Sequence, residues 1–191
     1  MIDTFEIRGH GLLLRGWRAG DEGDAAAVLR GLGDPEFRRW NTPLVPVDDL
    51  AAAHAYLRSR QEALASGESV ACCVTDESTG EVLGNVALSA ITPAFRSARV
   101  GYWVLPEARG RRVATRALSL ASRLAFGELG LYRIELDHAL GHEVSCKVAE
   151  RGGYRYEGTL RGAMFEAGRR DAFRDMHLHA RLATDPEPAV A

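Results

Sequence analysis

One stretch of the chain, between a predicted strand and a predicted helix, reads Pro106-Glu107-Ala108-Arg109-Gly110-Arg111-Arg112-Val113-Ala114-Thr115-Arg116. Four arginines lie where the helix begins, and the unpaired N–H groups of a helix start already carry a partial positive charge. Cations gathered there are unfavourable unless an anion lies among them. Gly110 lets the backbone approach a ligand closely, and a loop after a strand is the usual place for nucleotide phosphates in α/β proteins. The stretch therefore predicts a phosphate site, with a solvated face of arginines as the alternative.

The apolar residues around this stretch predict a mixed sheet. Val113, Ala117 and Leu120 recur at helical spacing between β-rich runs at residues 99–105 and 132–136. Such a crossover makes its two strands parallel. The other predicted elements are strands at residues 12–17, 69–75, 81–90, 154–161 and 173–182, and helices that begin after Asp21, after Asp48 and near His142. The fold class is therefore α/β (α+β), with a mixed, mostly antiparallel sheet flanked by helices.

Length and composition favour a single domain. The chain has 191 residues, 46% of them hydrophobic and 26% charged, as in ordinary globular proteins. No repeat or linker divides it. We expect one domain over residues 1–184 and a flexible, proline-containing tail over residues 185–191.

Charge and cysteine content exclude several classes of protein. With 24 basic and 26 acidic residues, the chain has no excess of positive charge that would favour nucleic acid as a partner. Its three cysteines suggest no disulfide framework, and residues 1–10 lack the pattern of a signal peptide. No apolar run is long enough to span a membrane. A cytoplasmic protein is expected. His177 and His179 share a strand face, but two ligands without a third are weak evidence for zinc, so no metal site is predicted.

Four segments occur together in an order that is typical of one enzyme family. The run from Arg109 to Ala114 matches the pattern Gln/Arg-x-x-Gly-x-Gly/Ala at both of its ends, and it departs from the pattern at Arg112, where glycine is usual. The other segments are Gly101-Tyr102-Trp103-Val104, Tyr132-Arg133-Ile134-Glu135 and His142-Glu143-Val144-Ser145-Cys146-Lys147-Val148-Ala149-Glu150-Arg151-Gly152-Gly153-Tyr154. With them, residues 12–182 resemble the GCN5-related N-acetyltransferases (GNAT). Three further segments resemble the RimJ/RimL-like branch, namely Trp40-Asn41-Thr42-Pro43, Glu157-Gly158 and Phe173-Arg174-Asp175.

This resemblance implies an acetyl-CoA donor and a primary-amine acceptor, which is a protein N-terminal α-amine or a small amine. It implies that the coenzyme lies between splayed parallel strands at residues 100–105 and 132–138. The cofactor-binding residues that it implies are Val104, Leu105, Arg109, Gly110, Arg111, Arg112, Val113, Ala114, Thr115, His142 and Ser145. The substrate-binding residues are Trp40, Asn41, Trp103 and Asp175. The alternative is a core or rim position for the tryptophans and a sheet-bracing role for Asp175.

Two residues are the predicted catalytic groups. Ser145 is the candidate proton donor because Ala149 occupies the position where many relatives have tyrosine; a helix serine bonded to the backbone is the alternative. Glu135 is the leading base, and an ion pair with Arg133 is the alternative. An α-amine, with a pKa near ~8 against ~10.4 for lysine, could lose its proton through a water relay. Glu166 could substitute as base if the turn before Phe173 curls inward.

Two other functions stay open at this point. Because Arg112, His142, Ala149 and Met164 depart from the family pattern, the chain could be a catalytically weak sensor that binds acyl-CoA. A transferase that uses succinyl-CoA is the other alternative, since an arginine could pair with the extra carboxylate. A monomer and a homodimer are both compatible with the sequence.

Overall fold

The structure is a computed structural model, and it describes residues 5–189. The predictions made for the two chain ends therefore fall partly on residues 1–4 and 190–191, outside the described part. The described end of the expected tail lies against the domain, because Asp185 pairs with Arg155 at 3.3 Å and Glu187 pairs with Arg181 at 3.3 Å. The domain boundary at residue 184 stays a prediction.

Eight strands form one mixed sheet in the order β1-β2-β3-β4-β5-β6-β8-β7. The strands are β1 (Glu6–Gly9), β2 (Leu12–Gly16), β3 (Val70–Asp76), β4 (Val82–Thr92), β5 (Ser97–Val104), β6 (Arg133–Ala139), β7 (Arg155–Phe165) and β8 (Phe173–Leu182). Every neighbouring pair is antiparallel except β5 and β6. This confirms the predicted fold class, including the parallel pair that the crossover helix requires.

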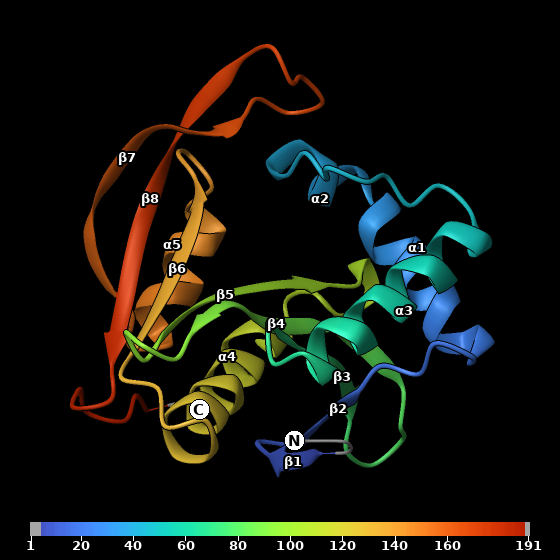
Figure 1. Cartoon of the computed structure of the whole chain (residues 1–191), viewed down its shortest axis with the longest axis horizontal. Helices are drawn as coiled ribbons and strands as arrows, with labels where there is room; N and C mark the ends of the chain where they lie inside the picture. The colour runs from blue at the N-terminus through green and yellow to red at the C-terminus, as the bar shows by residue number, and fades with distance from the viewer. Residues whose placement is uncertain (1–4, 190–191) are drawn as a thin grey trace.

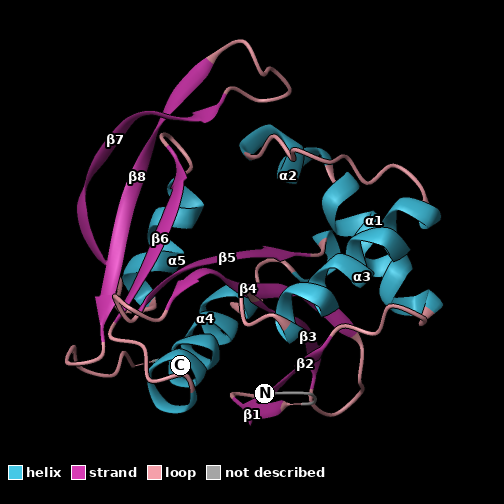
Figure 2. Ribbon diagram, viewed as in Figure 1, coloured by secondary structure: helices cyan, strands magenta, loops and turns pink. Residues whose placement is uncertain are grey.

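Helices cover both faces of the sheet (Figures 1 and 2). They are α1 (Glu22–Gly33), α2 (Pro35–Trp40), α3 (Leu50–Ala65), α4 (Val113–Arg123) and α5 (Glu143–Arg151). One apolar core lies between the sheet and α4, and a second core contains the buried residues of α1 and α3. Strand β3 belongs to both, since Cys72 packs into the first core and Cys73 into the second. Both thiols are free and buried, and burial raises the pKa of Cys72 to about 12.

Aspartates start the first three helices. Asp21 caps α1, as predicted, by accepting a hydrogen bond from the Asp24 N–H at 2.8 Å. The cap of α3 is Asp49, so the prediction of Asp48 was wrong by one residue; Asp48 instead pairs with Arg38 at 2.5 Å. Helix α2 and strand β1 were not predicted.

The strands β5 and β6 are joined over a short distance only. Residues Ser97–Arg99 pair with Arg133–Glu135, and beyond that point the two strands diverge. The splayed parallel strands that the family resemblance implies are therefore confirmed. Among residues 5–189, no helix combines the length and the apolar character needed to cross a membrane. The cytoplasmic location stays a prediction.

Candidate active site

A cleft of about 430 Å³ lies where β5 ends and α4 begins. Its other walls come from α2 and from the start of α5. The predicted site residues that line it are Trp40, Asn41, Trp103, Val104, Arg109, Gly110, Arg112, Val113, Ala114, Thr115 and His142. Leu105, Arg111, Ser145, Glu135 and Asp175 are not among its lining residues. Most of the predicted coenzyme site is thus one continuous surface.

The loop before α4 has the backbone of an anion-binding turn. Gly110 (φ 75°) and Arg112 (φ 55°) are both in the left-handed region, and no side chain caps the start of the helix. A left-handed conformation costs a non-glycine residue about 1–2 kcal/mol, which explains why the family pattern has glycine at the position of Arg112. The first N–H groups of α4 are uncapped by any side chain and face the same loop.

The arginines at this helix start have partners within the chain. Arg109 pairs with Asp34, and Arg111 lies 3.7 Å from the Asp76 carboxylate. Arg116 donates to the His10 carbonyl at 2.7 Å. Two of the anions among these arginines are therefore carboxylates of the chain itself, and the phosphate site stays a prediction. The support for a phosphate site now comes from the backbone of the loop and from the cleft beside it.

Arg151 is a cationic residue of the cleft that the sequence interpretation missed. It lies at the end of α5, and Val144 and Val148 line the cleft from the same helix. Positions i, i+4 and i+7 share one helix face, so the spacing of these three residues could have revealed it. Arg151 adds a positive charge to the cleft, on the wall opposite the loop before α4.

A pair of hydroxyl groups joins β5 to α5. The Tyr102 Oη and Ser145 Oγ atoms are 2.8 Å apart, and burial raises the pKa of Tyr102 to about 12. Tyr102 lines the cleft, whereas Ser145 is only 5% exposed and lies behind it. Tyr102 was missed as a site residue, although alternation along the strand places it on the same face as Val104. The predicted Ser145 therefore reaches the cleft through Tyr102.

The backbone N–H groups of the predicted cofactor-binding residues Val104 and Leu105 differ in their partners. The Leu105 N–H already donates to the Leu83 carbonyl on β4 at 2.9 Å, and the Leu105 side chain is 1% exposed. Successive N–H groups of a strand point to opposite edges. The Val104 N–H therefore points toward the splayed side, where it can serve an oxyanion. The expected role of Leu105 in cofactor binding was wrong for this amide.

Aromatic rings close the cleft near α2. The Trp40 and His142 rings are stacked, with centroids 4.5 Å apart and planes inclined by 2°. Burial lowers the pKa of His142 to about 4, so its imidazole is neutral at neutral pH. The Asn41 side-chain amide donates to the Phe37 carbonyl at 3.0 Å. Trp103 is mostly a core residue, because it is 7% exposed and stacks on Trp17 with centroids 6.0 Å apart.

With this geometry described, the chain can be compared with known proteins. A family model described as an acetyltransferase (GNAT) domain matches residues 11–155. The chain belongs to the GNAT acetyltransferase family. YdaF, a proposed ribosomal N-acetyltransferase of Bacillus subtilis (strain 168), is 34% identical over 89 residues, which are 47% of this chain and 49% of YdaF. The chain spans about half the length of the curated relatives it matches.

Solved structures resemble this GNAT chain over most of its length. Mycobacterium smegmatis RimJ, in complex with CoA-disulfide, has a TM-score of 0.81 and 26% identity, covering 94% of this chain and 87% of that chain. RimL, a ribosomal L7/L12 α-N-protein acetyltransferase in complex with coenzyme A, has a TM-score of 0.79 and 18% identity over 93% of this chain and 98% of that chain. The second similarity is one of fold alone. The similarities to YdaF and to RimJ confirm the expected RimJ/RimL-like branch.

The predicted base of this acetyltransferase domain is engaged elsewhere. Glu135 lies 3.0 Å from Arg133 and 3.9 Å from Arg99, which is the ion-pair alternative. Asp137 shares its sheet face by alternation, and burial raises the pKa of Asp137 although Arg99, at 3.5 Å, acts in the opposite direction. The sequence analysis did not single out Asp137, because Asp137 lies beyond the short stretch over which β5 and β6 are paired, and the sequence does not show where that pairing ends.

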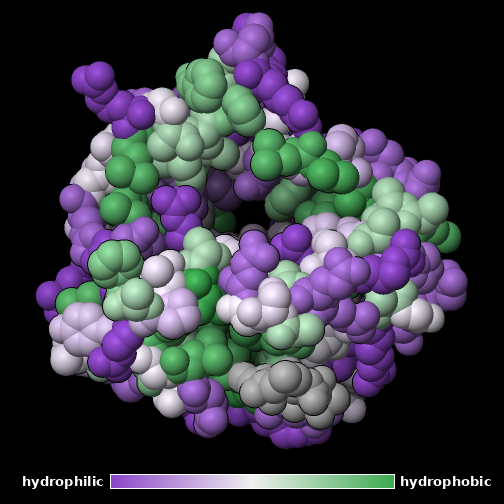
Figure 3. All heavy atoms as spheres, viewed as in Figure 1, coloured by the Kyte–Doolittle hydropathy of each residue, from purple (hydrophilic) through white to green (hydrophobic). Residues whose placement is uncertain are grey.

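The turn between β7 and β8 does curl inward. Thr42 donates to the Glu166 carbonyl at 3.0 Å, and Arg170 donates to the Pro43 carbonyl at 3.2 Å, so the turn contacts the chain after α2. A hollow is visible between this hairpin and α2 (Figure 3). Asp175 accepts a hydrogen bond from the Gly162 N–H at 2.8 Å and so braces a bulge in β7.

Proposed function

We propose that this protein transfers the acetyl group of acetyl-CoA to a primary amine, with a protein N-terminal α-amine as the favoured acceptor. The observation that carries the proposal is the cleft at the end of β5, beyond its pairing with β6, which brings the loop before α4 together with Tyr102, the hydrogen-bond partner of Ser145. Acetyl-CoA supplies a thioester whose carbonyl carbon is attacked by the amine.

The residues present fit a coenzyme with a diphosphate group. The loop at Gly110 is open, since no atom lies within 4 Å of a Cβ built there, and the N–H groups of α4 after it have no side-chain cap. These donors would hold phosphate oxygens, and Arg112 and Arg151 would add positive charge. Val104, Val113 and Val148 give the cleft an apolar wall for the arm that carries the acetyl group.

Acyl transfer also requires a donor to the carbonyl oxygen and a proton donor to the leaving sulfur. The Val104 N–H would stabilise the oxyanion. The Tyr102 hydroxyl would hydrogen-bond the sulfur as it becomes a thiolate, and Ser145, behind it, would orient that hydroxyl through the 2.8 Å contact. In this assignment Tyr102 acts directly, and Ser145 acts through it.

The acceptor amine must lose a proton before or during its attack. Neither Glu135 nor Asp137 lines the cleft; we favour Asp137 as the base acting through water, because burial raises its pKa whereas Glu135 pairs with both Arg133 and Arg99. An α-amine, with a pKa near ~8, loses its proton more easily than a lysine amine near ~10.4. A modest base acting through water therefore suits an N-terminal acceptor, and the similarity to YdaF, a proposed ribosomal N-acetyltransferase, supports the same class.

The experiment measures thiol release from acetyl-CoA in the presence of peptides with bacterial ribosomal-protein N-termini and of small amines. We expect release with peptides that have a free α-amine and none with the same peptides already acetylated. Coenzyme binding is measured in parallel by calorimetry. If acetyl-CoA binds but no acceptor causes thiol release, the protein is a sensor. If thiol release is faster from succinyl-CoA than from acetyl-CoA, succinyl-CoA is the donor.

A further inference from the structure

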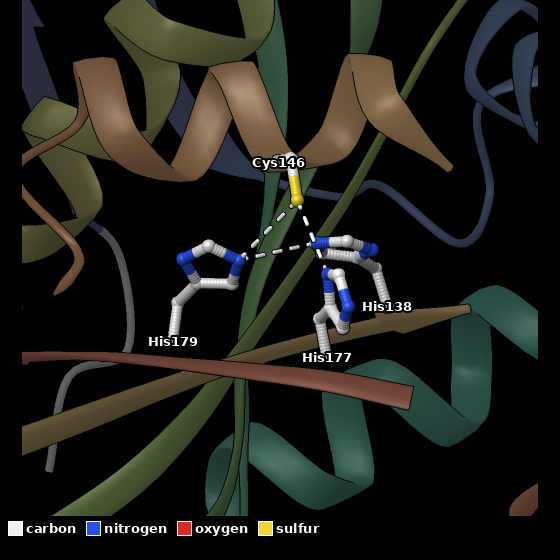
Figure 4. A group of neighbouring side chains, drawn as sticks. All are labelled: His138, Cys146, His177 and His179. Carbon is white, nitrogen blue, oxygen red and sulfur yellow. Dashed lines mark hydrogen bonds between the residues drawn. The ribbon is translucent and has the colours of Figure 1, made fainter. Parts of the chain in front are cut away.

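Four side chains that can bind a metal ion lie close together between helix α5 and strands β6 and β8, and one of them, Cys146, is next to Ser145 in the chain. His138 comes from β6, His177 and His179 come from β8, and Cys146 comes from α5. One ligand atom of each lies within 4.8 Å of all the others. Figure 4 shows the three imidazoles and the thiol directed toward one point between the helix and the strands.

The fold itself assembles this group. His177 and His179 are two residues apart in β8, so their side chains lie on the same face. The register of β6 with β8 places His138 opposite His177. Helix α5 crosses this face and contributes Cys146 one residue after Ser145. Sequence alone shows only the pair of histidines, because the other two ligands arrive through strand pairing and helix packing.

Three of the six distances between ligand atoms are close to those of a tetrahedral transition-metal site, and the others are no longer than 4.8 Å. Zinc binds histidine nitrogen at about 2.0–2.1 Å and cysteine sulfur at about 2.3 Å, so tetrahedral ligands lie about 3.3–3.4 Å (N···N) and about 3.5–3.6 Å (N···S) apart. The Nε2 atoms of His138 and His179 are 3.3 Å apart. The Cys146 Sγ lies 3.3 Å from His177 Nδ1 and 3.7 Å from His179 Nε2. Small side-chain rotations would bring the remaining pairs to these values.

The surroundings also favour a bound cation. His138 Nδ1 lies 3.0 Å from the Ala139 carbonyl, so a proton on Nδ1 leaves the Nε2 lone pair directed at the centre. The rings of His177 and His179 pack edge-on against Tyr156, at 5.0 Å and 5.6 Å between centroids. His138 and His179 are both buried, so the site is largely shielded from solvent.

We propose that His138, Cys146, His177 and His179 form a Zn²⁺ site that fastens α5 to β6 and β8. Four protein ligands leave no open position for water or substrate, so the metal has a structural role. It stabilises the helix that carries Ser145 without touching the reacting atoms. The site is independent of the acyl donor and of the acceptor.

The test uses untagged, full-length protein stripped with a chelator and then titrated with Zn²⁺ or Co²⁺. We expect one equivalent to bind, cobalt to show a sulfur-to-metal charge-transfer band, and zinc to raise the melting temperature. Cys146→Ser should abolish that band and weaken zinc binding by more than the about 10–100-fold that the loss of an outer-shell partner costs. His177→Ala is the second ligand variant, and His10→Asn, which changes an exposed histidine elsewhere, is the matched control.

Some outcomes would overturn the site. If the stripped wild-type protein binds no zinc at micromolar concentration, the four groups form a hydrogen-bond network only. If Cys146→Ser and His177→Ala bind zinc as tightly as His10→Asn, the metal lies elsewhere. Circular dichroism shows whether each variant is folded. Since metal content, spectrum and melting temperature are the readouts, an inactive enzyme leaves this test intact.

Discussion

The sheet has an N-terminal part, β1 to β4, and a C-terminal part, β6 to β8, which are called its two ends below and are stabilised in different ways. All residues of β3 except the last are buried, because α4 covers one face and α1 and α3 cover the other. Strand β7, the edge strand of the other end, has no fully buried residue, and the same is true of β1 at the opposite edge. The first end is therefore stabilised by the burial of apolar side chains, which follows from the hydrophobic pattern of the sequence. The second depends on specific polar partners.

Those polar partners form a chain of contacts across β6 and β7. Arg133 donates to both carboxylate oxygens of Glu157, at 2.9 Å and 2.6 Å, and to Glu135 at 3.0 Å. Glu157 raises the pKa of Arg133, and Arg133 in turn lowers the pKa of Glu157. The cluster of His138, Cys146, His177 and His179 lies on the other face. The strands of the C-terminal end are thus positioned in part by ion pairs and hydrogen bonds, which the hydrophobic pattern of the sequence does not predict.

The largest expected effect tests this difference directly. Leu88→Ala on β4 removes a side chain that is 1% exposed, so we expect a loss of about 2–5 kcal/mol in the free energy of unfolding. The matched variant is Leu160→Ala, which changes a half-buried residue of the mostly exposed strand β7, and for it we expect a loss of about 1 kcal/mol or less. Urea unfolding measures both. Equal losses would show that the two ends share one kind of core.

The predictable parts of the fold follow the same division. The parallel pair, the crossover helix and the Asp21 cap depend on residues close in sequence, and the structure confirms them. Helix α2 was not predicted, because Asp34-Pro35 is also typical of the place where a helix ends. The same two residues also begin a helix, since Asp34 caps α2 and proline suits its first position.

The second expected effect concerns the junction of the two ends, where Tyr102 of β5 meets Ser145 of α5. Tyr102→Phe should lower kcat about 100-fold, the lower end of what a positioned proton donor contributes. Ser145→Ala should lower kcat about tenfold, because it removes one hydrogen bond to that donor. Both should leave coenzyme binding nearly unchanged. A larger effect from Ser145→Ala than from Tyr102→Phe would assign the proton to the serine.

The candidate site could be predicted only where its residues are close together in the sequence. The loop from Arg109 to Thr115 carries its own glycine and helix start, so its place in the cleft could be inferred. The partner of Arg109 could not, because Asp34 lies 75 residues away. Tyr102 and Arg151, which line the cleft, were missed for a related reason: each becomes a site residue only because α5 packs beside β5.

The third effect tests whether Arg151 of α5 contributes positive charge to coenzyme binding in addition to the loop before α4. Arg151→Ala should weaken coenzyme A binding about fivefold, or ~1 kcal/mol, because the contact is partly exposed and is screened by salt. The matched control is Arg123→Ala, an exposed arginine at the end of α4 outside the cleft. Calorimetry at low and high salt measures both. An effect of Arg151→Ala that is no larger than that of the control would assign the phosphates to the loop before α4 alone.

The smallest effect is a pH dependence at His142, which packs on Trp40 between the two ends. Burial lowers the pKa of His142 to about 4; His138, Arg174 and Arg39 act in the same direction, and Glu36 opposes them. Between about pH 6.5 and about pH 4 the unfolded chain therefore binds more protons at this residue than the folded chain, and stability falls as the pH falls. His142→Asn restores the family residue and removes this group. We expect its urea midpoint, measured with chelator present, to fall less than that of the wild type between about pH 7 and about pH 5. Parallel curves would mean that His142 titrates alike in both states, and the contact between α2 and α5 would then be solvated.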